Sequence, residues 1–365
     1  MRVRLRDLAE SLGLSVMAVS KALHDAPDIG ASTKARVRAE AEKRGYWPNQ
    51  AARSLRSKQS GLIGLLVPDL ASEESAGIAG GLLRAAETAG ISVMVAAPGE
   101  KKGGEAAQVK AMMGRGSEAI FILPKITTEH RSLALEAVTT AGLPVIFFQR
   151  YPADVTPGRA RVGWVMRDMP QAAQLVLDHL WKLGHRGVAY LGGHPADRGH
   201  AEHLRAVRDG ARQRGMELVG EETMAGLTPE DGEREMAKWL ERKIKPSAVI
   251  CGNDAVAAGV ARAAVTAGLR IPAELSVIGL GDGELARHGP VPLTSVAFGN
   301  MGKAGFELWM AGREGGEIMP RVVGVSWWIE DRPGQLMGKR PRIKVIVNAA
   351  RERERNGSLS GGVHV

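Results

Sequence analysis

Short apolar runs alternate with segments of helical periodicity along most of the chain. Such runs predict buried strands, and the alternation predicts two open α/β lobes with parallel sheets. In sheets of this kind, ligands bind beyond the carboxyl ends of the strands. The helical patterns of the first lobe cover 79–90, 105–115 and 133–141. The predicted strands are 62–67, 91–95, 119–123 and 144–148, followed by 187–191, 248–251 and 275–278.

The first 60 residues follow a different, wholly helical pattern. Apolar residues at helical spacing predict a first helix that ends at Gly13, and Ser15 is suited to cap a second helix over 16–23. A third helix is predicted over 31–44. Two helices joined by a short glycine-containing turn are typical of the helix-turn-helix motif. The inward face of the third helix is predicted to consist of Ala35, Val37 and Ala41.

The order and spacing of three segments are specific to one family. The segments are LRDLA at 5–9, LSVMAVSKAL at 14–23 and RGYWPNQAARSL at 44–55. With these segments the chain resembles the LacI/GalR family of bacterial repressors, and further similar motifs extend the likeness over residues 3–332. The resemblance implies a small all-α helix-turn-helix domain followed by two periplasmic-binding-protein-like α/β lobes. The further motifs are VPD at 67–69, LGHR at 183–186, GG at 192–193, PSAVICGND at 246–254 and VPLTSV at 291–296.

The resemblance also implies a domain order. The chain is expected to cross between the lobes near 162, 298 and 323, and the tail is expected to be basic and flexible, with one possible strand over 343–347. The expected domains are the DNA-binding head at 1–48, the hinge helix and linker at 49–60, the two-lobed effector-binding and dimerisation domain at 61–332, and the tail at 333–365. The first lobe would comprise about 61–162 plus 299–322, and the second about 163–298 plus 323–332.

In the head, the resemblance implies three sets of DNA contacts. Lysine can donate to guanine acceptors and an apolar side chain can touch a thymine methyl group, whereas phosphate contacts fix the register. An apolar side chain at Leu55 could enter a base step from the minor groove and kink the duplex. The base readers would be Val16, Met17 and Lys21, the phosphate contacts Ser15, Ser20, Thr33, Tyr46 and Asn49, and the minor-groove residues Ala52, Arg53 and Leu55.

Two caps of the head depart from the family pattern. Arg4 stands where the family has a threonine that caps the first helix, so this cap is expected to be weaker. Gly30 replaces a serine cap, and glycine is tolerated at that position.

The effector cleft departs from the family most. Gln149 and Gly281 stand at frequent aspartates, His203 at a ligand-gripping arginine and Phe298 at a polar position, which disfavours a monosaccharide effector. Glu73 and Glu74 either favour a cationic ligand or are solvated at the cleft rim, and a cleft without any small molecule is a third alternative. The expected cleft residues are Glu74, Gln149, Arg150, Asp168, His203, Asn253, Asp254, Gly281 and Phe298.

Charge strengthens the case for a polyanionic partner. Residues 1–60 hold 12 Lys and Arg against 6 Asp and Glu, and residues 333–365 hold 7 against 2, within a total net charge of +9. The middle of the chain is therefore close to neutral. A basic head on a near-neutral body indicates that the head binds double-stranded DNA, for which we expect a pseudo-palindromic operator and a homodimer, with a tetramer left open.

The remaining features narrow the alternatives. One cysteine, Cys251, excludes an internal disulfide, and with no signal peptide or apolar span a cytoplasmic, nucleoid-associated protein is expected. A solute-binding protein for transport shares the two lobes, but the basic head disfavours it. An enzyme is disfavoured because no nucleophile–base motif occurs, and we expect no cofactor. The spacing of His194, His200 and His203 fits no standard metal site, which favours surface histidines.

Overall fold

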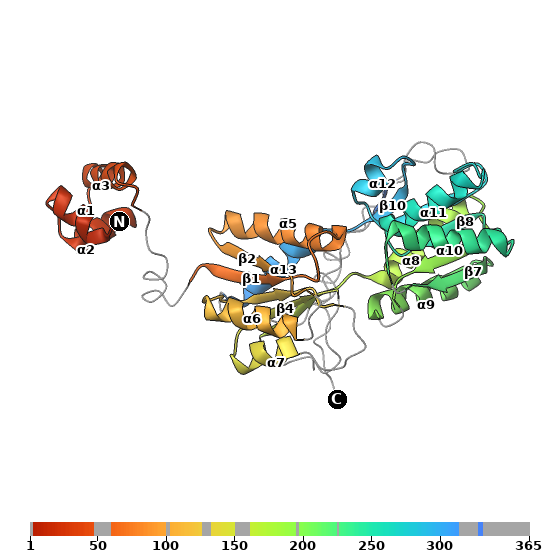
Figure 1. Ribbon diagram of the computed structural model, residues 1–365, viewed down its shortest axis with the longest axis horizontal. Helices are drawn as coiled ribbons and strands as arrows, with labels where there is room; N and C mark the ends of the chain where they lie inside the picture. The colour runs from red at the N-terminus through yellow and green to blue at the C-terminus, as the bar shows by residue number, and fades with distance from the viewer. Residues whose placement is uncertain are drawn as a thin grey trace, which may run out of the picture. The chain divides into compact units, whose positions relative to one another are not determined.

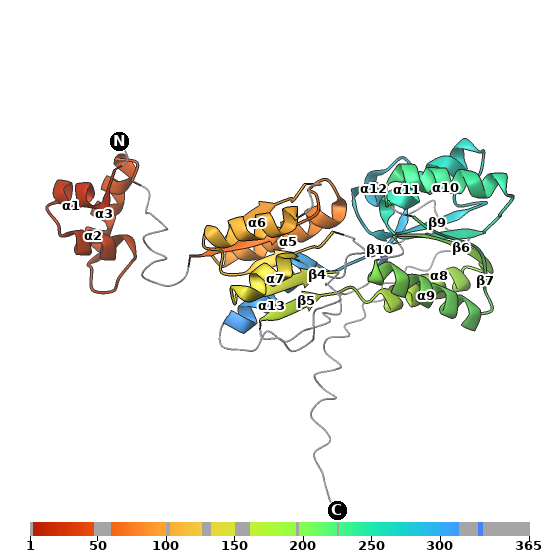
Figure 2. The same cartoon turned by 60° about the horizontal axis from the view of Figure 1, so that its bottom comes forward.

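The structure is a computed structural model of the chain (Figures 1 and 2). The chain divides into two compact units, residues 1–60 and 61–365. No helix among the described residues is both long enough and apolar enough to cross a bilayer. The residues that the structure describes are 3–46, 60–99, 103–125, 133–149, 161–194, 197–224, 226–313 and 328–330.

Three helices form the first unit around a small apolar core. Leu8, Val19 and Val37 are completely buried, one from each helix. The predicted inward face of the third helix is wrong at Ala35, which is exposed, because the buried stripe runs through Val37 and Ala41 at a spacing of four residues. The helices are α1 (Leu5–Leu12), α2 (Val16–Leu23) and α3 (Ala31–Lys43).

Local caps fix where the helices of the head begin and end. Gly13 has a φ of 64° and closes α1 in the left-handed conformation, which glycine adopts without steric cost. The Ser15 hydroxyl accepts a hydrogen bond from the Ala18 amide at 3.1 Å and caps α2. Neither α1, which follows Arg4, nor α3, which follows Gly30, has a side-chain cap hydrogen bond at its N-cap residue, although the Asp7 carboxylate accepts the Arg4 amide at 2.8 Å.

The first lobe of the second unit is a parallel sheet covered by helices on both faces (Figure 1). Its strand order is β2-β1-β3-β4-β5, and its apolar strands are buried by α5 and α13 on one face and by α6 and α7 on the other. The strands are β1 (Leu62–Leu66), β2 (Ser92–Ala96), β3 (Ile120–Ile122), β4 (Val145–Phe148) and β5 (Val162–Val165). The helices are α5 (Glu73–Thr88), α6 (Gly104–Gly114), α7 (Leu133–Thr140) and α13 (Met301–Arg313).

The second lobe repeats this construction. Its strand order is β11-β10-β9-β8-β6-β7, parallel except that β11 pairs antiparallel with β10. Helices α8 and α9 bury one face of the sheet, and α10, α11 and α12 bury the other. The strands are β6 (Gly187–Gly192), β7 (Glu217–Thr223), β8 (Ala248–Cys251), β9 (Ser276–Gly281), β10 (Thr294–Ala297) and β11 (Trp328–Glu330). The helices are α8 (Met169–Lys182), α9 (Arg198–Gln213), α10 (Pro229–Glu241), α11 (Asp254–Thr266) and α12 (Glu284–His288).

The sequence prediction lacks four of the observed strands, β5, β7, β10 and β11, and it places the start of α5 too late. Strand β5 pairs in parallel with β4, so the border expected near residue 162 moves to the segment after Val165. Strand β7 was missed because its residues ELVGEET are mostly polar and only partly buried at the sheet edge. Helix α5 begins at Glu73, earlier than predicted, because Ser72 caps it by accepting the Ser75 amide at 3.3 Å.

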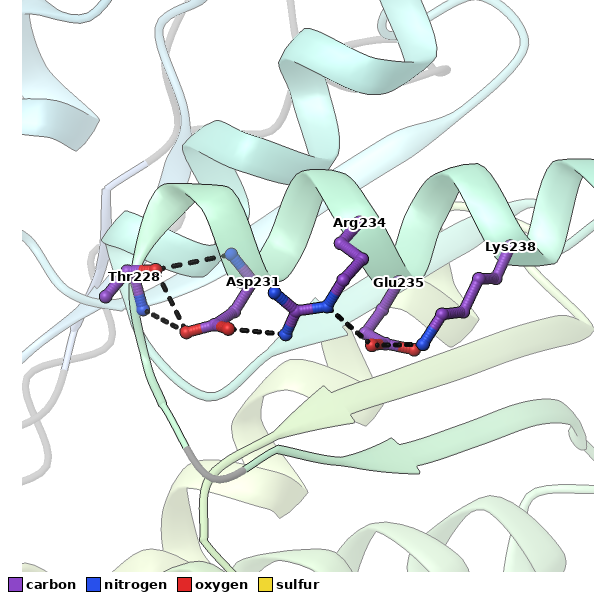
Figure 3. A network of polar contacts seen from close by, with 5 residues as sticks. All are labelled: Thr228, Asp231, Arg234, Glu235 and Lys238. Atoms are coloured by element: carbon purple, nitrogen blue, oxygen red, sulfur yellow. Dashed lines mark hydrogen bonds and ion pairs between the residues drawn. The ribbon is translucent and has the colours of Figure 1, made fainter.

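Polar side chains fix the start of α10 (Figure 3). The Thr228 hydroxyl accepts the Asp231 amide at 3.3 Å, and the Asp231 carboxylate accepts the Thr228 amide at 3.2 Å. Arg234 donates to both Asp231 and the buried Glu235, which also accepts from Lys238 at 2.8 Å. The hydrogen bond from Arg234 is the main cause that lowers the pKa of Asp231. This network spans the first three turns of the helix.

Helices α10 and α11 pack so closely that their backbones are in contact at Gly259. A Cβ atom at Gly259 would lie 1.8 Å from the Pro229 carbonyl oxygen, so Gly259→Ala forces the helices apart. We expect the free energy of unfolding to fall by about 1–3 kcal/mol, the usual cost of overpacking. Urea denaturation measures the change. Gly77→Ala, in the interior of α5 with no atom within 4 Å of the added carbon, is the control and should not destabilise the chain. Equal stability of wild type and Gly259→Ala would contradict the close packing.

Candidate functional sites

The exposed face of α2 carries the residues expected to contact bases. Val16 is 44% exposed and Met17 is 70% exposed, and both lie in the first turn of α2. Lys21 is exposed in the last turn. Large apolar side chains with this exposure contribute nothing to the core of the head, so they are available for contact with a partner.

Several cations of the head form ion pairs with acidic residues of the same unit. The Lys21 ammonium donates to the Asp28 carboxylate, and this hydrogen bond is the main cause that lowers the pKa of Asp28. Asp25 pairs in the same way with Arg38, and the Lys34 ammonium lies 3.8 Å from its other carboxylate oxygen. In the loop between α2 and α3, Asp28 therefore binds a cation of α2, whereas Asp25 binds cations of α3.

The expected phosphate contacts are only partly within the described residues. Ser15 is exposed, and its cap uses only the hydroxyl oxygen as an acceptor. Ser20, Thr33 and Tyr46 are half-buried, and the Tyr46 ring packs against the core of the head. Asn49, Ala52, Arg53 and Leu55, together with Arg150 and the tail 333–365, lie outside the residues that the structure describes.

In the two-lobed unit, three expected cleft residues are connected through Arg167. The Gln149 amide donates to the Glu74 carboxylate at 3.0 Å, and the Arg167 guanidinium lies 3.7 Å from the same oxygen. The guanidinium also lies over the Phe298 ring, 3.8 Å from its centroid, in cation–π geometry. Arg167 follows β5 of the first lobe and Phe298 follows β10 of the second, so this cluster joins two crossover segments.

A second contact joins the lobes through Glu73. The Leu285 amide donates to the Glu73 carboxylate at 3.3 Å, and the carboxylate packs so closely on Gly283 that a Cβ there would lie 2.1 Å from it. Glu73 starts α5 of the first lobe, whereas both partners belong to the start of α12 in the second. Glu73 therefore contacts the second lobe, and Glu74 contacts Gln149 and Arg167. The alternative that both acids are only solvated at the rim of the cleft is wrong.

Asp254 is the most perturbed acid of the second lobe. It is completely buried, and its carboxylate accepts from the Ser295 hydroxyl at 2.6 Å and from the Gly283 amide at 2.8 Å. Burial raises the pKa of Asp254 to about 6, against the lowering effect of these two hydrogen bonds. Gly281 has a φ of 136° and a Cβ there would lie 3.0 Å from the carboxylate, so an aspartate in its place would be strained and repelled.

Two further expected cleft residues cap helices. The Asp168 carboxylate accepts the Gln171 amide at 3.0 Å at the start of α8. Asn253 accepts the Val256 amide at 2.8 Å at the start of α11, and its own amide donates to the Leu227 carbonyl at 3.0 Å. These side chains thus stabilise local structure at the carboxyl end of the sheets.

His203 corrects one sequence interpretation. The histidines were interpreted as surface residues, but His203 is completely buried and packs on Tyr190, with ring centroids 5.5 Å apart. Burial lowers the pKa of His203 to about 3 and raises that of Tyr190. The ring is therefore neutral at physiological pH. Within the described residues, no group of three acidic, histidine or cysteine side chains could hold a metal ion.

The sequence did not indicate the residues that connect the expected cleft residues to one another. Arg167 was not selected because β5, which places it beside Gln149, was not predicted. Ser295 and the amide of Gly283 were missed because their role depends on burial of Asp254, which has no sequence signature. A charged residue two positions after the end of an apolar run is the signal that could have indicated Arg167, because β5 ends at Val165.

The head with an exposed helix-turn-helix face, joined to two α/β lobes, defines a transcriptional regulator with a periplasmic-binding-protein-like sensor. Residues 177–325 match the family described as a periplasmic binding protein-like domain. The maltose regulon regulatory protein MalI of Escherichia coli K12 is 30% identical over 264 residues, which cover 71% of this chain and 74% of the relative. Catabolite control protein A of Priestia megaterium is 27% identical over 301 residues, 81% of this chain and 87% of the relative. The chain belongs to the LacI/GalR family of transcriptional regulators.

Solved structures share the fold. The lac repressor dimer bound to operator and the anti-inducer ONPF aligns with a TM-score of 0.78 at 24% identity, covering 92% of this chain and all of that one. A LacI transcriptional regulator from a Rhodococcus species aligns with a TM-score of 0.63 at 26% identity, covering 75% of this chain and 98% of that one. The family and fold inferred from the sequence are thereby confirmed, and these relatives are regulators, not enzymes.

Proposed function

We propose that this regulator is a repressor that binds a pseudo-palindromic operator as a homodimer in the cytoplasm. The observation that carries the proposal is the pair of exposed apolar side chains, Val16 and Met17, on a helix that the buried core holds rigidly. Two-fold symmetry of a dimer imposes two inverted half-sites on the DNA. The lac repressor, which shares the fold, is a dimer bound to operator.

We propose that an effector binds at the junction of the two lobes. We also propose that the protein acts as a regulator without a cofactor and without catalysis. Glu74, Gln149 and Phe298 lie beyond the carboxyl ends of strands, where ligands of such sheets bind. A ligand changes DNA affinity only through different affinity for the two lobe arrangements, typically about 1–3 kcal/mol. Because Glu74 contacts Arg167 and Gln149 already, an effector must replace or extend these contacts.

Selection from a randomised duplex library by the full-length protein tests the proposal. We expect enrichment of two inverted half-sites and an affinity that falls steeply with salt, with a log–log slope of about −0.9 for each phosphate neutralised. The measurement is fluorescence anisotropy of the enriched duplex at several salt concentrations. Absence of any enriched motif, or affinity that does not change with salt, would refute DNA binding by the basic head.

A further inference from the structure

We propose that Asp28 determines the DNA specificity of the head by holding the ammonium group of Lys21 in the direction of the bases. Asp28 lies in the loop after α2, and Lys21 lies in the last turn of α2. The inference rests on the proposed function, because it assigns a role within DNA recognition. It adds a positioning residue to the expected base readers, since Asp28 acts on the DNA through Lys21.

The geometry of the Lys21–Asp28 pair indicates that it positions the lysine and contributes little to the stability of the fold. The Lys21 ammonium donates to the Asp28 carboxylate, and the side chains are 46% and 53% exposed. Exposed ion pairs add little to stability, so the core of the head does not depend on this contact. Lysine is a compact charge on a flexible stem, and without a fixed partner its ammonium samples many directions.

The chemistry of the pair favours bases over phosphates. The ammonium has three donors, and one bond to Asp28 leaves two for the O6 and N7 acceptors of a guanine. A lone lysine would bind any phosphate, which adds affinity without sequence information. The adjacent carboxylate repels phosphates and makes the pair nearly neutral overall. Asp28 therefore reduces non-specific attraction and preserves the contact of Lys21 with guanine.

The same loop supplies a matched control. Asp25 is also exposed, at 65% of its side chain, and it also pairs with cations, but these are Arg38 and Lys34 of α3. Asp25 has a φ of 55°, a conformation that asparagine tolerates well. Asp25→Asn thus removes the same charge from the same loop without releasing Lys21.

The experiment compares full-length wild type with Asp28→Asn, Asp28→Glu and Asp25→Asn on a randomised duplex library, followed by anisotropy on single-base variants of the enriched duplex. Asp28→Asn should reduce the preference for guanine at one position of each half-site about tenfold. It should also steepen the salt slope by about 0.9 per head, since the released lysine then neutralises a phosphate. Asp28→Glu should recover part of the preference, and Asp25→Asn should keep all of it.

Two results would overturn the inference without touching the proposed function. One is an unchanged base preference in Asp28→Asn, and the other is an equal loss in Asp25→Asn, which would show an effect of charge alone. If wild type itself enriches no motif, both the proposed function and this inference fail. Thermal unfolding of each variant, expected to match wild type, separates altered recognition from an altered fold.

Discussion

Replacing Val16 and Met17 together with glutamate is expected to abolish specific DNA binding by this regulator while the protein stays folded. Both side chains are exposed, so the change leaves the core of Leu8, Val19 and Val37 intact. Loss of recognition at one base pair costs about 1–3 kcal/mol, the range typical of a single mismatched pair. The new carboxylates also repel the phosphates, so we expect a loss of about 10²–10⁴-fold, with tenfold for each 1.4 kcal/mol.

The matched control lies in the other unit. Val265 on α11 is 50% exposed, close to the 44% of Val16, and Val265→Glu adds the same kind of charge away from α2. Anisotropy on the enriched duplex should show wild-type affinity for Val265→Glu and none of the specific binding for the double variant. If the double variant bound with unchanged affinity, α2 would not be the recognition helix.

The stability of the fold is expected to depend on pH through the buried Asp254. The stability of wild type relative to Asp254→Asn is expected to fall as the pH rises from about 4 to about 6. Burial raises the pKa of Asp254 from 3.8 to about 6, so the folded protein binds this proton more tightly than the unfolded chain does. The contribution of the neutral acid is present at low pH and is lost as the pH rises through about 6. At 1.36 kcal/mol for each pKa unit, the difference amounts to about 3 kcal/mol.

Urea denaturation of both proteins across this range measures the effect, and the difference between them removes the titration of all other groups. The asparagine amide has the same shape as the protonated acid, and it can accept from the Gly283 amide and donate to the Ser295 hydroxyl. A difference that does not change between about pH 4 and about pH 7 would mean that Asp254 titrates alike in both states.

The sequence predicted most elements whose signals are local. Helix α2 was predicted to the residue because Gly13 and Ser15 mark its start. Most buried strands were predicted because they are mainly apolar, whereas β5 and β10 were missed although all of their residues are buried. The edge strand β7 was missed because exposure allows polar residues there. Because β5 was not predicted, Arg167 was not recognised as a residue that follows a strand.

The sites were predicted less completely, because contacts between distant residues depend on packing. The family resemblance indicated Glu74, Gln149 and Phe298, but no pattern in the sequence showed that Arg167 connects them. The burial of His203 was likewise not predictable from spacing, since a histidine on a helix can face either way. Only the structure distinguishes a capping residue such as Asn253 from one free to meet a ligand.

The stacking of Arg167 on Phe298 has a mechanical consequence for the two passages of chain between the lobes. The guanidinium lies against the Phe298 ring of the second lobe while it also faces the Glu74 carboxylate of the first. A change of lobe arrangement that moves Phe298 away from Arg167 must therefore give up the cation–π attraction, which contributes about 0.5–2 kcal/mol. This cost sets part of the free-energy difference between two lobe arrangements, the quantity on which an effector would have to act.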